Sequence, residues 1–155
     1  MKKLVVFYSR TGTTKKVSEM LTRLLKADID EIMDEKNRAG IFGYIWGGRD
    51  ALSEKTTKIK FSKNPKEYDI IIIGTPIWAG KMAPAVRTYL LDNKSKLKKV
   101  AFFCTKGGEG NGKTFEGMEK LAGKPIATLS LRTKEVINNE TEKAMEFIKT
   151  IKLSP

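Results

Sequence analysis

Histidine is absent from this 155-residue sequence, and cysteine occurs once, at Cys104. Without histidine, the chain lacks the most common metal ligand of proteins and the base of Ser-His and Cys-His nucleophile pairs. These absences exclude zinc enzymes and hydrolases that use such pairs, and we expect neither a metal site nor a catalytic side chain. A single cysteine excludes an intramolecular disulfide, which favours a reducing, cytoplasmic location.

Long hydrophobic runs are missing as well. The apolar stretch from Leu4 to Tyr8 is too short for the core of a signal peptide. No other run approaches the roughly 20 residues that span a membrane, so we expect no membrane partner. The hydrophobic fraction of 40% suits one domain over residues 1–155.

Acidic residues are few, since 18 Asp and Glu oppose 30 Lys and Arg, which gives a formal charge of +12. Such an excess favours acidic partners. Two stretches are rich in lysine: Lys55, Lys58, Lys60, Lys63 and Lys66, then Lys94, Lys96, Lys98 and Lys99. Because they lack interleaved aromatic residues for base stacking, we expect these stretches to dock an acidic protein rather than nucleic acid.

Short apolar runs without alternation predict strands that are buried on both faces. Four are clear and the Asp28–Met33 run is weaker; the clear ones are Leu4–Tyr8, Ile70–Ile73, Val100–Phe103 and Ile126–Leu131. Helical patterns lie between them: Val17 to Leu25, Ala83 to Leu91, and a last helix after a capping box of Asn139 and Glu142, with Met145, Ile148 and Ile151 inward. Alternating strands and helices predict an α/β protein whose parallel sheet is covered on both sides.

Five strands suit a sheet of order 2-1-3-4-5, in which strands 1, 3 and 4 are neighbours, and the loops after these three strands lie at the edge where ligands bind. The first, Ser9 to Thr14, leads directly into a helix, so its backbone N–H groups and hydroxyls can cradle a phosphate. Capping of the helix by Thr13 or Thr14 alone is the alternative. In the second, Thr75 to Gly80, Trp78 is placed to lie along a flat ligand or to pack under its own loop.

The third loop, Thr105 to Gly112, has four glycines that permit close backbone approach to a ligand. Residues Gly107 to Thr114 match the phosphate-binding pattern G-x-x-x-x-G-K-[ST]. A nucleoside triphosphatase also needs an acidic residue at the end of a strand to hold magnesium. None of the four clear predicted strands ends in one, so we do not expect triphosphate binding.

The whole chain resembles the short-chain type of the flavodoxin family. The first loop is similar to the family's FMN-phosphate signature, and the second and third resemble the loops on either side of the flavin ring. The third loop and the run Gly43 to Asp50 look like flavodoxin-domain proteins of anaerobic bacteria and archaea. The resemblance implies a three-layer α/β/α sandwich with a five-stranded parallel sheet in the order 2-1-3-4-5, and FMN as cofactor. It implies these cofactor-binding residues: Ser9, Arg10, Thr11, Gly12, Thr13, Thr14, Thr75, Pro76, Ile77, Trp78, Ala79, Gly80, Thr105, Lys106, Gly107, Gly108, Gly110 and Asn111.

Two functions are compatible with this resemblance. The first is electron transfer to an acidic redox partner, by a monomer or weak homodimer; charge reversal at Lys94 to Lys99 would slow that reaction. The second is an FMN-dependent reductase or dehydrogenase that acts on a small substrate, such as a quinone or a porphyrin-like molecule, with NAD(P)H or a quinone as the other reactant. For this enzyme, Phe42, Tyr44 and Trp46 could form a lid or a dimer contact, although such residues more commonly cover the core.

Flavodoxins are usually acidic, so we expect lysines near the flavin to give a less negative reduction potential here.

Overall fold

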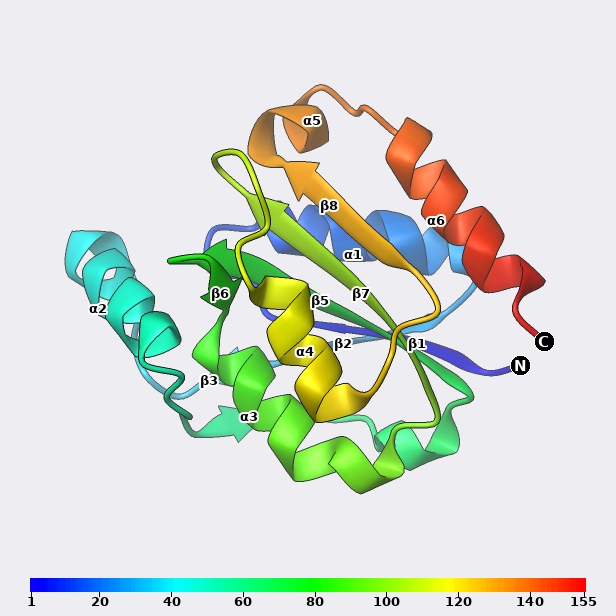
Figure 1. Cartoon of the computed structure of the whole chain (residues 1–155), viewed down its shortest axis with the longest axis horizontal. Helices are drawn as coiled ribbons and strands as arrows, with labels where there is room; N and C mark the ends of the chain where they lie inside the picture. Colours follow the sequence, from blue (N-terminus) through cyan, green and yellow to red (C-terminus); the bar gives the residue numbers. More distant parts are fainter.

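Five parallel strands form the centre of the protein in a computed structural model that describes residues 1–155 (Figure 1). They are β1 (Lys3–Phe7), β2 (Asp28–Glu31), β5 (Ile70–Trp78), β7 (Lys99–Lys106) and β8 (Thr128–Arg132). Their order is β2-β1-β5-β7-β8, which confirms the predicted order 2-1-3-4-5. The order reverses between β1 and β5, so the carboxyl ends of these strands form the predicted binding edge.

Helices cover both faces of the sheet (Figure 1). On one face lie α1 (Thr13–Leu25), α5 (Thr133–Ile137) and α6 (Glu142–Leu153); on the other lie α3 (Pro84–Asn93) and α4 (Thr114–Ala122). Each face of the sheet has its own hydrophobic core. Along β1, Val5 and Phe7 belong to the core under α1, α5 and α6, whereas Leu4 and Val6 belong to the core under α3 and α4. Successive strand side chains point to opposite faces, so a strand covered on both sides must be apolar throughout. The three-layer sandwich is therefore confirmed.

The last helix differs from its prediction. Helix α6 begins at Glu142, and Asn139 lies outside it with a φ of 54°. The capping box of Asn139 and Glu142 is therefore wrong. Ile148 and Ile151 are buried as predicted, together with Phe147, whereas Met145 is half-exposed.

Residues 34–66, the least regular part of the sequence, contain a helix and short pairing segments. The pairing segments are β3 (Met33–Asp34) and β4 (Ile59–Lys60), and a 3-10 turn, η1 (Pro65–Glu67), follows them. Strands β3 and β4 form a separate antiparallel pair. The helix, α2 (Gly40–Leu52), projects from the side of the sheet (Figure 1).

Helix α2 buries its small residues and exposes its large ones. Its buried residues are Gly43, Gly47, Asp50 and Ala51, and six large apolar side chains face outward: Ile41, Phe42, Tyr44, Ile45, Trp46 and Leu52. The expectation that Phe42, Tyr44 and Trp46 cover the core is wrong, because α2 turns its glycines, not its aromatic residues, toward the rest of the protein. No helix of the protein combines the length and apolar composition needed to cross a bilayer.

Candidate functional site

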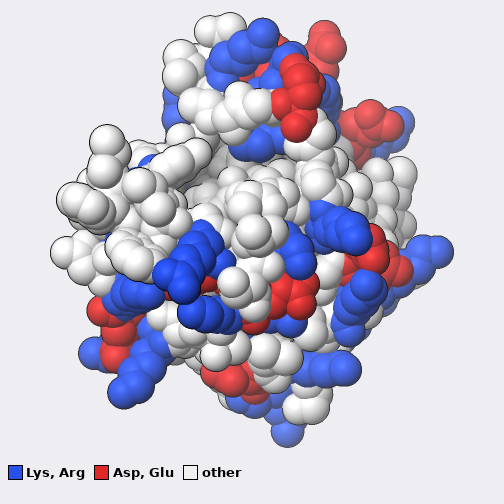
Figure 2. Space-filling view, turned by 60° about the vertical axis from the view of Figure 1, so that its left-hand side comes forward, with Lys and Arg blue, Asp and Glu red and all other residues white.

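The three predicted loops lie together at the carboxyl ends of β1, β5 and β7, which are neighbours in the sheet. A hydrogen bond of 2.7 Å between the buried hydroxyls of Thr14 and Thr105 joins the first loop to the third. Figure 2 shows the side of the molecule that carries α2: a hollow lies near its centre, lined mainly by residues other than Lys, Arg, Asp and Glu. The fold therefore brings three distant parts of the sequence together at one edge of the sheet.

The first loop is shaped as an open cradle. Ser9 Oγ accepts a hydrogen bond of 3.1 Å from the Gly12 backbone N–H, and Gly12 has a φ of 97°. Helix α1 begins at Thr13, and no side chain caps its first turn. The alternative that Thr13 or Thr14 merely caps the helix is therefore not what the structure shows. The N–H groups at a helix N-terminus favour an anion.

The second loop forms a tight hairpin that the sequence did not predict. Strand β5 continues to Trp78 and returns through β6 (Lys81–Met82). Ala79 and Gly80 both have positive φ, at 49° and 75°, as a two-residue hairpin turn requires. Thr75 Oγ1 accepts a hydrogen bond of 3.0 Å from the Ala83 N–H at the start of α3, so this hydroxyl positions the helix.

Trp78 is only 8% exposed. Its ring packs edge-on against Tyr8 at 5.6 Å, and Gly47 of α2 lies against its other edge. The Arg38 guanidinium lies 5.7 Å from the ring centre. Trp78 therefore packs against the end of β1, α2 and the segment before α2 rather than under its own loop. A role of Trp78 beside a flat ligand stays a prediction.

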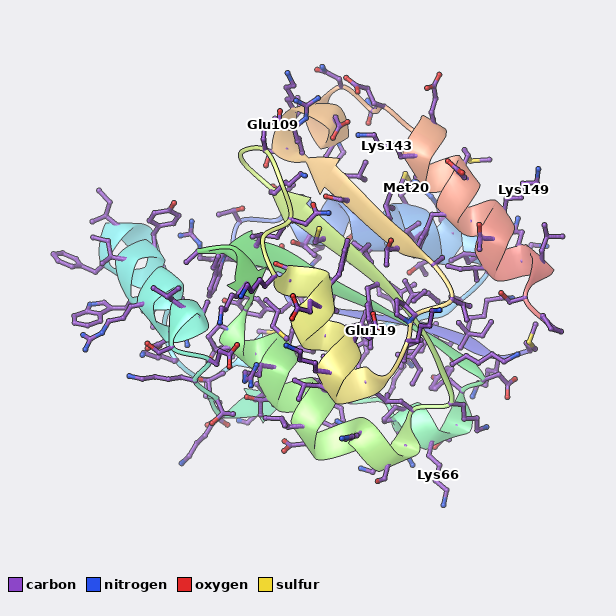
Figure 3. All side chains as sticks on the ribbon, in the orientation of Figure 1. Met20, Lys66, Glu109, Glu119, Lys143 and Lys149 are labelled. Carbon is purple, nitrogen blue, oxygen red and sulfur yellow. The ribbon has the colours of Figure 1, made fainter.

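Beyond Thr105, the polar side chains of the third loop bond to one another or to residues of β8. Asn111 Oδ1 accepts hydrogen bonds from Ser130 Oγ at 2.5 Å and Lys106 Nζ at 2.9 Å. Glu109, labelled at the loop tip in Figure 3, pairs with Arg132 at 2.5 Å. The glycines Gly107, Gly108 and Gly110 are exposed, with nothing within 4 Å of the place where a side chain would begin. Their backbone is open to a ligand.

The triphosphate-like pattern has a structural explanation. Thr114 is fully buried, and its hydroxyl donates a hydrogen bond of 3.2 Å to the Gly80 carbonyl. The Lys113 N–H donates to the same oxygen at 2.8 Å. Gly112 has a φ of 54° and lies so close to Gly80 that a side chain would collide with it. These residues join the third loop to the second and do not form a phosphate loop.

A buried ion-pair cluster beside the site was missed from the sequence. Arg38, 4% exposed, donates to Asp34 at 2.6 Å and to Asp50 at 3.0 Å. Although burial opposes it, hydrogen bonds from Lys36 and Arg38 hold the pKa of Asp50 below its usual value. Burial, together with the charge of Asp34, raises the pKa of Tyr8 to about 12, so its hydroxyl stays protonated. The only signal in the sequence was the run Gly43 to Asp50.

The cluster fixes α2 next to the first loop. Asp50 belongs to α2, whereas Asp34 and Arg38 precede it. The Arg10 guanidinium lies 5.3 Å from the Tyr44 ring centre, which adds a cation–π contact between the first loop and the helix. Part of this junction is a cavity of about 240 Å³ whose lining includes Ser9, Arg10 and Arg38. No group of His, Cys, Asp or Glu is placed to hold a metal ion.

Comparison with known proteins identifies the family. A family model described as flavodoxin matches residues 2–149, so the chain belongs to the flavodoxin family. The family predicted from the sequence is thereby confirmed, and with it FMN as the cofactor characteristic of that family. No curated protein sequence matches the chain significantly.

Solved structures with the same fold include flavoproteins of different kinds. A flavoprotein from Lactobacillus acidophilus in complex with FMN is 23% identical, with a TM-score of 0.71 over 91% of this chain and 99% of that one. A flavodoxin from the domain Archaea is 17% identical, with a TM-score of 0.57 over 98% and 99% of the two chains. An NADH:FMN oxidoreductase is 13% identical, with a TM-score of 0.59 over 98% and 87%. At these identities the likeness shows the fold alone.

Proposed function

We propose that this protein binds FMN without a covalent bond and carries electrons between redox partners. The observation that carries the proposal is the uncapped N-terminus of α1 at the end of the Ser9–Thr14 loop, together with the exposed glycine backbone of the third loop, which follows β7 and is joined to the first loop by the bond between Thr14 and Thr105. The first feature suits a phosphate and the second suits close approach to a flat ring. Membership of the flavodoxin family and the FMN complex of the Lactobacillus protein support the same cofactor.

Each loop has a definite task in this proposal. The N–H groups and hydroxyls of Ser9 to Thr14 hold the phosphate, and Arg10 adds positive charge beside it. The backbone of Gly107 and Gly108 lies along one side of the ring, where its peptide groups tune the electron affinity of the flavin. The bound FMN supplies the redox chemistry, because a flavin takes up or releases electrons one or two at a time. The hydrogen bond between Thr14 and Thr105 fixes the position of the first loop relative to the third.

The partner contacts the carboxyl edge of the sheet in this proposal. The predicted docking residues Lys94 to Lys99 lie at or just before the start of β7, at the amino edge of the sheet, and therefore on the side away from the three loops. Strand β7 has eight residues, which separates the two edges by about 25 Å at ~3.3 Å per residue. Arg10 follows β1 and Lys106 ends β7, both at the carboxyl edge, where a partner with an acidic surface would bring its redox centre close to the cofactor.

The test is titration of the purified apoprotein with FMN, followed by absorbance and calorimetry. We expect one FMN per chain and weaker binding of riboflavin, which lacks the phosphate. Gly12→Ala places a side chain where φ is 97°, and the strain of about 1–2 kcal/mol would distort the cradle and raise Kd for FMN about tenfold.

Gly123→Ala is the matched control, because Gly123 has a φ of 88° and equally open surroundings but lies after α4, away from the loops. It should leave Kd unchanged. A protein that binds no FMN, or one in which both variants bind equally, would contradict the proposal.

An FMN-dependent reductase is the second candidate, favoured by the shared fold of the NADH:FMN oxidoreductase. The two functions differ in one measurement. A reductase turns over NAD(P)H with a quinone in the absence of any protein partner, whereas a carrier exchanges electrons rapidly only with a reduced or oxidised protein.

A further inference from the structure

The outer face of α2 has the residue spacing of a helix that packs against another helix. Ile41, Ile45, Gly48 and Leu52 are separated by four, three and four residues, which places them in one stripe. The three large members are 74%, 58% and 59% exposed. Gly48 has nothing within 4 Å of the place where a side chain would begin, so a second helix can approach closely there. No element of this chain covers the stripe.

The residues beside the stripe are those that protein interfaces favour. Phe42, Tyr44 and Trp46 flank it, and Arg49 lies over the Trp46 ring at 5.2 Å. Aromatic residues and arginine are enriched at interfaces, whereas lysine and glutamate are depleted. Helix α2 has neither lysine nor glutamate, although lysines are abundant elsewhere in the chain. This composition also disfavours an anionic membrane as the occupant, because helices that lie on such membranes carry several lysines or arginines.

The distribution of charge leaves this face free for a second copy. Two molecules of charge +12 repel each other over most of their surfaces. In Figure 2 the projecting α2 lobe is almost entirely white, whereas lysines and arginines are abundant below and to the right of it. Two copies can therefore meet through α2 with the least repulsion.

The exposed area is close to what a stable dimer needs. A large aromatic side chain buries roughly 150–250 Å². Six large side chains on α2, which are 46–74% exposed, therefore offer on the order of 600–700 Å² per copy. A standard interface buries about 800 Å² per partner, and residues around the helix can supply the difference.

We propose that the outer face of α2 is the interface of a symmetric homodimer, in which the Ile41, Ile45, Gly48 and Leu52 stripes of two copies pack together. A two-fold axis makes each copy present the same patch to the other. The ion pairs of Arg38 with Asp34 and Asp50 hold α2 rigid from behind. Because Tyr44 contacts Arg10, the second copy lies beside the first loop of the site. The proposal does not depend on the redox function.

Sedimentation velocity of the protein with and without FMN, from about 1 to 200 µM, tests the proposal across the affinity range of ordinary interfaces. We expect a dimer that dissociates on dilution. Ile45→Asp should raise the dimer Kd at least about thirtyfold, as loss of a central interface residue does. The matched control is Ile137→Asp on α5, because Ile137 is 66% exposed; it should change Kd less than about threefold. Circular dichroism of both variants checks that they fold.

A second arm tests the other occupants with sedimented vesicles of phosphatidylcholine, with and without phosphatidylglycerol. The proposal predicts no difference between wild type and Ile45→Asp in vesicle binding. A protein that stays monomeric at 200 µM overturns the proposal, as does equal weakening by the two variants. Binding to phosphatidylglycerol vesicles that Ile45→Asp abolishes would assign α2 to a membrane surface instead.

Discussion

Glu135 on α5 is a buried carboxylate that joins the end of β8 to α6. It is 4% exposed and accepts hydrogen bonds of 2.6 Å from Lys143 Nζ and from the Arg132 backbone N–H; Lys143 is labelled on α6 in Figure 3. These bonds lower its pKa to about 2 from a usual value near 4.5. A depressed pKa stabilises the folded state above the unfolded pKa and ceases to do so as pH falls through the folded pKa.

We therefore expect Glu135→Gln to lower the free energy of unfolding at pH 7 by up to about 3 kcal/mol. The difference from wild type should shrink between about pH 4.5 and pH 2, where wild type itself becomes protonated. Urea denaturation at several pH values measures it. Glu146→Gln on the exposed side of α6 is the control and should show little effect; a gap that stays constant down to pH 2 would refute the role of the charge.

At the scale of elements, α2 is attached by close backbone contact rather than by a large buried side chain. A side chain added at Gly43 would meet the Arg38 carbonyl oxygen at 2.0 Å, so Gly43→Ala must push the helix away and strain the pair between Arg38 and Asp50. Overpacking of this kind costs about 2–3 kcal/mol. We expect that loss in urea denaturation, together with faster proteolysis within α2.

Gly117→Ala on α4 is the matched control for this prediction. The added side chain would meet only the terminal methyl of Met82, at 3.1 Å, and this flexible group can move. The free energy of unfolding should change by less than about 1 kcal/mol. If the two variants were equally stable, the close contact of α2 with Arg38 would not limit its attachment.

At the scale of the whole molecule, the charge of +12 acts on any negatively charged group in the site. Bound FMN gains negative charge when it is reduced, and a positive protein stabilises that form. Salt screens this effect over about 10 Å at 0.1 M and 3 Å at 1 M. We therefore expect the midpoint potential of bound FMN to become more negative as salt increases, in a potentiometric titration. Free FMN is the control; a potential that is constant or rises with salt would contradict the expectation.

The central sheet and the three loops could be predicted because local sequence decides them. Ile70 to Ile73 has no polar residue, and only a strand covered on both faces needs such a run. Ser9 to Thr14 joins a strand to a helix, so its place at the edge of the sheet followed from the strand order. The predicted start of α6 was wrong, because Asn and Thr are both common N-cap residues, so that Asn139 and Thr141 both suit the position and only packing selects between them.

The site beside the loops could not be predicted from local patterns. Arg38, Asp34 and Asp50 meet only after α2 folds back on the sheet, and charged residues in an irregular segment usually lie in solvent. Trp78 could contact a ligand or the protein, and which it does depends on how close Gly47 approaches it. The apolar residues of α2 suggested a face buried in the core. The sequence shows that these residues are hydrophobic, but not whether they face the core or the outside.

The amino-acid sequence was enough for the buried strands, the helices between them and the three loops, since these depend on periodicity or on residues adjacent along the chain. The flavodoxin fold and the strand order followed from the number of strands and from the resemblance of those loops to the family. Only the tertiary structure decided which residues of those loops remain open, and that α2 turns its glycines inward and its aromatic residues outward. The physical reason is that a helix is oriented by the neighbour that it must fit. Gly43 and Gly47 fit tightly against Arg38 and Trp78, and this contact, made across the fold, leaves the large apolar residues on the outside.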